Sequence, residues 1–171
     1  GILNGTCNYI LTTMDQTGRG FDTVLPEAQA LGYAEADPTL DVDGGDTGHK
    51  LCLLTALAFG CVLDYAHLSV QGIRKVSISD IRMARAWGYR IKLVAQARRL
   101  LDGRILQMVA PTLVAEALPL AQVDGVLNAV AMEADPVGRS FVSGRGAGAG
   151  PTASAVVADI LDEISGRYVL P

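Results

Sequence analysis

The order of helical and extended patterns along the chain constrains the fold more than any other feature. Apolar residues recur at helical spacing in the first half, whereas short apolar runs bounded by turn residues dominate the second half. The expected helices are residues 4–17, 21–31, 46–59, 79–87 and 151–165. The expected strands are residues 107–114, 125–133 and 139–142. Asp102-Gly103 lies between two apolar runs and predicts a hairpin. Helices followed mostly by strands indicate an α+β fold, with a mixed or antiparallel sheet packed with helices.

The composition is that of one globular domain. The chain has 171 residues, of which 50% are hydrophobic and 19% are charged. It is therefore long enough to bury a core and too apolar to be disordered, and we expect residues 1–171 to form a single domain. The net charge is −4, and no run of lysine and arginine is longer than an adjacent pair. Both observations disfavour nucleic acid as a partner.

Neither a membrane segment nor a leader is expected. The longest apolar stretch, residues 51–63, is interrupted by a threonine and a glycine and is too short to cross a bilayer. No charged segment followed by an apolar one opens the chain, so a cytoplasmic location is predicted. Cys7, Cys52 and Cys61 are odd in number and lack the spacing of metal ligands. They indicate unpaired thiols in a reducing compartment, and no metal site.

The segment GYAEADPTLDVDGGDTGHK, residues 32–50, is rich in acidic residues and ends in a lysine. Residues 33–45 carry no period and are expected to form a loop. Lys50 lies four residues after Asp46, and on a helix this spacing places the two side chains within reach of an ion pair. A lysine held by a carboxylate can exchange a proton with a substrate hydroxyl, and Glu35 and Asp41 could hold an ammonium group. The alternative is an ordinary surface salt bridge beside a solvated acidic loop, and the spacing is not that of a calcium loop.

A second notable segment is glycine-rich and leads into the last helix. Residues 144–152 read GRGAGAGPT, in which Gly144, Gly146 and Ala149 formally satisfy the GxGxxG/A pattern. Only about twenty residues follow, too few to complete a dinucleotide-binding βαβ unit. The alternatives are a tight strand-to-helix turn, or a loop that touches a cofactor bound mainly elsewhere.

Three blocks of sequence resemble the signature blocks of the homoserine dehydrogenase family. They are GILNGTCNYIL at the start, AQALGYAEADPTLDVDGGDTGHK in the middle and GRGAGAGPTASAVVADI near the end. The resemblance spans nearly the whole chain in the expected order. It implies the NAD(P)-dependent interconversion of L-homoserine and L-aspartate 4-semialdehyde, in the biosynthesis of threonine, methionine and isoleucine.

The resemblance also implies roles for individual residues. Lys50 corresponds to the acid–base lysine and Asp46 to its partner. The residues that correspond to the substrate site are Glu35, Asp41, Tyr33 and Thr6. The residues that correspond to the cofactor site are Asn4, Gly5, Gly146 and Gly148. Cys7 departs from the pattern, because a hydroxyl residue is expected at its position.

The largest departure from the family is the missing Rossmann domain. A family member carries this domain before the segment seen here, and the first residue is Gly1 rather than methionine. We therefore expect a catalytic and dimerisation domain from a longer polypeptide, with NAD(P) bound mainly outside it and little activity alone. A homodimer through residues 107–142 is expected. The alternatives are a non-catalytic dimerisation or substrate-binding module, or a related dehydrogenase with another substrate.

Overall fold

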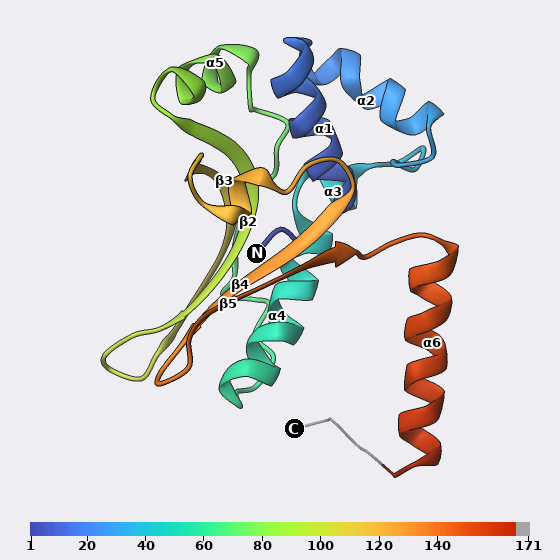
Figure 1. The fold of residues 1–171 in the computed structure, drawn as a ribbon, viewed down its shortest axis with the longest axis vertical. Helices are drawn as coiled ribbons and strands as arrows, with labels where there is room; N and C mark the ends of the chain where they lie inside the picture. The colour runs from blue at the N-terminus through green and yellow to red at the C-terminus, as the bar shows by residue number, and fades with distance from the viewer. Residues whose placement is uncertain (167–171) are drawn as a thin grey trace.

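The computed structural model describes residues 1–166 and contains helices and strands in the order expected of an α+β fold (Figure 1). The helices are α1 (Gly5–Thr17), α2 (Phe21–Ala30), α3 (Thr39–Val42), α4 (Gly45–Phe59), α5 (Ile78–Ala86), the short 3₁₀ helix η1 (Pro119–Gln122) and α6 (Ala149–Ile164). The strands are β1 (Ser69–Val70), β2 (Tyr89–Arg99), β3 (Ile105–Ala115), β4 (Leu127–Ala134) and β5 (Gly138–Arg145). The predicted fold class is thereby confirmed.

The structure differs from the prediction at several boundaries and in one predicted loop. Helix α5 begins at Ile78 rather than at residue 79 or 80, because Ser77 and Asp80 form a capping box in which Asp80 is the third helical residue. Helix α6 begins two residues before Pro151, which a first helical turn accepts because its N–H groups have no acceptor within the helix. The predicted loop 33–45 contains helix α3, whose Val42 is fully buried.

The strands form two sheets. In the first, β3 pairs with β2 in antiparallel fashion and with the two-residue β1 in parallel fashion. The hairpin between β2 and β3 turns at the predicted Asp102-Gly103. In the second, β4 and β5 form an antiparallel pair. Strand β2 had not been predicted as a strand, because the buried side of its alternating pattern includes Arg90 and Lys92.

The first two residues connect the two sheets. Gly1 exchanges hydrogen bonds with Ala95 of β2, at 2.6 Å and 2.9 Å. Ile2 exchanges hydrogen bonds with Ala129 of β4, at 2.7 Å and 2.9 Å. The segment before α1 is thus held on both sides, and Asn4 is placed at the junction of the sheets and the helices.

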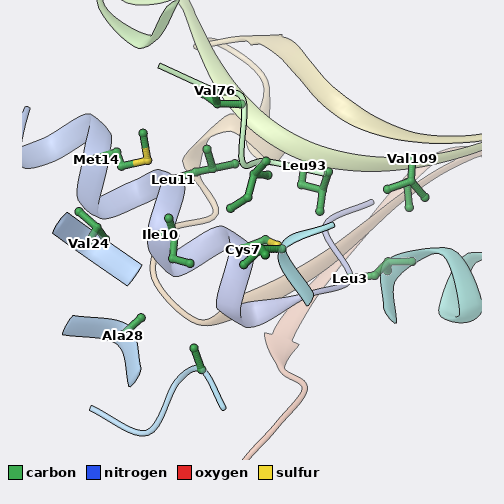
Figure 2. Packing of buried hydrophobic residues seen from close by; sticks show 14 of the residues in the cluster. Leu3, Cys7, Ile10, Leu11, Met14, Val24, Ala28, Val76, Leu93 and Val109 are labelled. Carbon is green, nitrogen blue, oxygen red and sulfur yellow. The ribbon is translucent and has the colours of Figure 1, made fainter. Parts of the chain in front are cut away.

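Helix α1 lies at the centre of the core. Its Ile10, Leu11 and Met14 are at most 1% exposed. Figure 2 shows these side chains between residues of α2 on one side and residues of the β2–β3 sheet on the other. Burying such side chains contributes roughly 1.5–3 kcal/mol each, so the position of α1 is firmly determined. The helix ends at Gly18, as the sequence predicted, in a left-handed conformation with φ of 71°.

Helix α6 differs from the other helices because none of its residues is buried. Figure 1 shows it standing apart from the rest of the ribbon, joined to β5 by a short loop. Its large apolar side chains are exposed, and they are Val156, Val157, Ile160, Leu161 and Ile164. Within residues 1–166, no helix combines the length and the hydropathy needed to cross a membrane.

Candidate functional site

The first and middle sequence blocks meet at the side chain of Asn4. Asn4 is the N-cap of α1, and its Oδ1 accepts a hydrogen bond from the Cys7 N–H at 2.8 Å. Its Nδ2 donates to Asp41 Oδ1 at 2.7 Å and to Asp46 Oδ2 at 2.8 Å. Asn4 is only 5% exposed. Two aspartates from the acidic segment are thereby attached to the start of α1.

Lys50 completes this group. Its Nζ donates to Asp46 Oδ2 at 2.7 Å and to the Leu3 carbonyl at 3.3 Å. The Lys50 side chain is 48% exposed, and an i,i+4 pair at such a position contributes only about 0.3–0.5 kcal/mol to stability. The pair therefore matters for geometry rather than for stability. Within residues 1–166, the third hydrogen of the ammonium group has no partner and is available to a ligand.

The turn between α3 and α4 determines where Asp46 lies. Gly44 caps α4 with φ of 88°, a conformation that favours glycine. A Cβ atom on Gly44 would lie 3.0 Å from Val70 Cγ1, so the turn is also closely packed against β1. The run of small residues before Lys50 thus places Asp46 in the first turn of α4, where a negative charge is favoured.

Cys7 supports the same group from α1. Its thiol donates to the Asp41 carbonyl at 3.2 Å, which is the contact that a hydroxyl residue would also make. Burial raises the pKa of the Cys7 thiol well above its usual range, and the negative charges of Asp41, Asp46 and Asp43 raise it further. The thiol therefore stays protonated and acts as a donor, not as a nucleophile. The departure from the family pattern preserves the polar contact.

Of the other predicted substrate residues, Thr6 lies in α1, and Tyr33 and Glu35 lie on the loop between α2 and α3. Thr6 Oγ1 donates to the Tyr33 carbonyl at 2.6 Å, and the Tyr33 ring packs 4.8 Å from that of Tyr9. Gln29 Nε2 donates to the Glu35 carbonyl at 2.9 Å. The Glu35 side chain is exposed. Among the described residues, no hydrogen bond joins the Glu35 carboxylate to the group around Asn4.

Strands β4 and β5 bring the glycine-rich residues 144–152 back toward the start of α1. A Cβ atom on Gly5 would lie 3.0 Å from the Val126 carbonyl oxygen, just before β4. Leu127 of β4 pairs with Arg145 of β5, the residue before Gly146. A Cβ atom on Gly146 would lie 2.1 Å from Asn128 Nδ2, so a larger residue there would require the Asn128 side chain to move. Gly148 then precedes α6 with φ of 114°, and no side chain caps this helix.

A buried group of charges lies further along α1, at Asn8 and Asp15. Lys92 is 1% exposed and donates to Asn8 Oδ1, to the Val123 carbonyl and to Asp124 Oδ1, at 3.2, 2.6 and 3.0 Å. Arg90 pairs with Asp15 at 3.0 Å and with Asp124 at 2.7 Å. Sequence reasoning missed this group, because its members are spread over more than a hundred residues. A hollow of about 200 Å³ elsewhere is lined by residues that include Gln71, Lys75 and Thr112, and by none of the predicted site residues.

The structure thus brings together Asn4, Asp41, Asp46 and Lys50, and leaves Glu35 beside them on a separate loop. The role of Asn4 in joining the two aspartates was not expected, since its partners lie 37 and 42 residues away. The arrangement defines a class of domain: an α+β domain whose clustered lysine and aspartates are suited to proton transfer on a small polar substrate.

Comparison with known proteins identifies the family within this class. The sequence profile of homoserine dehydrogenase matches residues 1–161. The homoserine dehydrogenase of Neisseria gonorrhoeae is 53% identical over 162 residues, which are 95% of this chain and 37% of that protein. The crystal structure of a homoserine dehydrogenase from Thiobacillus denitrificans is similar with a TM-score of 0.90 and 50% identity, over 93% of this chain and 37% of that chain. The chain belongs to the homoserine dehydrogenase family.

A more distant relative carries a cofactor. A hyperthermophilic archaeal homoserine dehydrogenase mutant in complex with NADPH is similar with a TM-score of 0.79 and 31% identity, over 99% of this chain and 48% of that chain. In each of these three comparisons the chain spans less than half of the relative's length.

Proposed function

We propose that the full-length polypeptide carrying this chain interconverts L-homoserine and L-aspartate 4-semialdehyde with NAD(P). In this proposal the chain supplies the substrate-binding and proton-transfer groups. The observation that carries it is the hydrogen-bonded group of Asn4, Asp41, Asp46 and Lys50, in which two family signature blocks converge.

Lys50 is the group that exchanges the proton. Its ammonium is oriented by Asp46 and by the Leu3 carbonyl, which leaves one donor for the oxygen of the substrate. In the direction of homoserine oxidation, the neutral amine of Lys50 accepts the hydroxyl proton and becomes the ammonium, and in the reverse direction the ammonium returns that proton to the substrate oxygen. Asp46 orients the Lys50 side chain through its hydrogen bond at 2.7 Å.

Asp41 and Glu35 orient the substrate. Asp41 is held by Asn4 through one carboxylate oxygen, and the other accepts no hydrogen bond within residues 1–166. That oxygen and the exposed Glu35 carboxylate can accept hydrogen bonds from the ammonium group of homoserine. Thr6 of α1 holds the loop that carries Glu35, because its hydroxyl donates a hydrogen bond to the Tyr33 carbonyl. The contribution of these residues is to position the reacting carbon.

In this proposal the chain contacts only part of the nicotinamide cofactor, and the rest of the cofactor binds elsewhere in the polypeptide. The uncapped start of α6 after Gly148 offers free N–H groups to an anionic group of the cofactor. In residues 1–166 the parallel pairing is limited to β1 with β3, so a dinucleotide-binding βαβ sheet must come from elsewhere in the polypeptide. The cofactor, when bound, accepts hydride from the carbon that carries the hydroxyl group.

The first test is homoserine-dependent reduction of NAD+ and NADP+ by the full-length polypeptide. Wild type is compared with Lys50→Ala and with the control Lys75→Ala, which removes an exposed lysine outside the group. We expect Lys50→Ala to lower kcat/KM by about 10²- to 10⁴-fold, and Lys75→Ala to leave it unchanged.

The other outcomes are equally informative. If activity survives Lys50→Ala, the proposed reaction stands, and a group other than Lys50 must transfer the proton. A folded wild type that binds homoserine without turnover would favour a non-catalytic binding module. Turnover of other hydroxy acids or aldehydes alone would indicate a related dehydrogenase.

We also propose a homodimer in the cytoplasm. Exposed apolar side chains occur on β3, β4 and β5, and Met132 and Val142 among them share one face of the β4–β5 pair. The full set is Leu106, Leu113, Met132, Phe141 and Val142. A second copy of the polypeptide could cover such a surface. Three unpaired cysteines support a reducing compartment.

A further inference from the structure

The carboxamide of Asn4 is fully used within the protein. Its two amide hydrogens go to Asp41 and Asp46, and its oxygen accepts from the Cys7 N–H. The side chain therefore has no hydrogen left with which to bind a cofactor. We propose that Asn4 is a positioning residue, which orients Asp41 toward substrate and Asp46 toward Lys50. This inference rests on the function proposed above and assigns to Asn4 a role other than cofactor binding.

The charges around Asn4 explain why a donor is needed there. The two carboxylates accept from a single nitrogen, so their oxygens are forced close together. Lys50 offsets the charge of Asp46, whereas Asp41 has no cationic partner within residues 1–166. Nearby, Asp43 is paired with Arg74 at 2.6 Å, and the Cys7 thiol is neutral. The Asn4 amide thus supplies one hydrogen-bond donor to each of the two carboxylates at the point where they approach each other.

Helix capping alone does not explain the choice of asparagine. An N-cap requires only an acceptor for a backbone N–H, and aspartate, serine and threonine supply one about as well. The two hydrogens that reach Asp41 and Asp46 come from the amide group, which these alternatives lack. Asn4→Asp therefore preserves the cap and the size of the side chain, and replaces the donor by a third carboxylate.

The test compares wild type with Asn4→Asp and Asn4→Ser in the full-length polypeptide, with homoserine and NAD(P)+ across pH 5–10. Asn4→Asp should lower kcat/KM at neutral pH by about 30-fold or more, and should move the acidic limb of the pH profile upward by about one unit. KM should rise because Asp41 is misoriented, and kcat should fall because Asp46 no longer holds Lys50. Asn4→Ser adds no charge, so it should lower kcat/KM without moving the acidic limb.

The outcomes separate this inference from the proposed function. A wild type with no homoserine-dependent activity overturns both. An active wild type with Asn4→Asp within threefold of it and an unmoved acidic limb overturns the positioning role alone, because capping is then sufficient. If Asn4→Asp does not fold, Asn4→Ser decides: unchanged kcat and KM in a folded Asn4→Ser protein would overturn the role, and a loss in both would support it.

Discussion

Lys92 is a buried cation whose three hydrogen bonds tie separate parts of the chain together. Its ammonium group connects β2 to α1 through Asn8 and to the segment before β4 through Val123 and Asp124. Burial lowers the pKa of Lys92, although the hydrogen bond from Lys92 to Asp124 opposes this shift. Burial alone would raise the pKa of Asp124, but hydrogen bonds from Arg90 and Lys92 outweigh it and lower that pKa. This group holds α1 at Asn8 and Asp15, further along the helix than Asn4.

Replacing Lys92 by methionine should destabilise the protein. The substitution leaves Asn8 Oδ1 without its donor and removes one of the two donors to the Val123 carbonyl, at a cost of about 2 kcal/mol. Thermal unfolding of the full-length polypeptide would measure the loss, with the exposed Lys75→Met as the control. A Lys92→Met protein as stable as wild type would show that these groups find other partners.

The pH dependence of the same variant follows from the lowered pKa. The window of interest runs from the lowered pKa of Lys92 in the folded protein to its pKa of about 10.4 in the unfolded chain. Within this window, the unfolded state binds more protons at Lys92 than the folded state does. The free energy of unfolding of wild type therefore gains a contribution as pH rises through this window. Lys92→Met lacks that contribution, so its deficit should be larger at pH 10 than at pH 7.

At the scale of elements, two glycines flank α4, and they differ in how closely their surroundings are packed. Gly44 and Gly60 both have positive φ, at 88° and 63°. A Cβ atom on Gly44 would lie 3.0 Å from Val70 Cγ1, whereas one on Gly60 would meet nothing within 4 Å. The same alanine substitution therefore strains the backbone at both ends of the helix, and disturbs packing near Asp46 only at the first.

We expect Gly60→Ala to cost about 1 kcal/mol and to leave activity unchanged. Gly44→Ala should cost about 2–3 kcal/mol, and should lower kcat/KM about tenfold by shifting Asp46 relative to Lys50. Unfolding and homoserine oxidation measured on both variants would test this. Equal effects at the two sites would mean that the position of α4 does not depend on the turn before it.

The sequence predicted those elements whose signals are local. The left-handed Gly18 at the end of α1 and the Asp102-Gly103 hairpin are determined by neighbouring residues, and both were found. Strand β2 was missed because Lys92 is buried by partners far away in the sequence. The two-residue β1 was missed because it exists only through pairing with β3.

The same distinction applies to the site. The Asp46–Lys50 pair follows from helical spacing and was predicted, and it is present at 2.7 Å. The bonds from Asn4 to Asp41 and Asp46 depend on the packing of α1 against the acidic segment, which no local pattern encodes. The predicted substrate and cofactor roles of these residues remain predictions.

At the scale of the whole molecule, the exposed apolar side chains on β3, β4 and β5 predict a dimer of the full-length polypeptide. Val142 on β5 is 61% exposed, and an aspartate at this position would place a charge in the expected interface. Val62, which follows α4, is 89% exposed and provides the matched control. Both substitutions are at exposed positions, so neither should unfold the chain.

Light scattering after size-exclusion chromatography measures the mass of each variant at several concentrations. Wild type and Val62→Asp should have the mass of a dimer, and Val142→Asp should dissociate to a monomer at low micromolar concentration. The proposed catalytic group lies around Asn4, at α1, α3 and α4, so the monomer should keep homoserine oxidation if each copy carries a complete site. A wild type that is monomeric even at high concentration would exclude this interface. A Val142→Asp dimer would instead place the contact on another surface, of which the exposed apolar face of α6 is one.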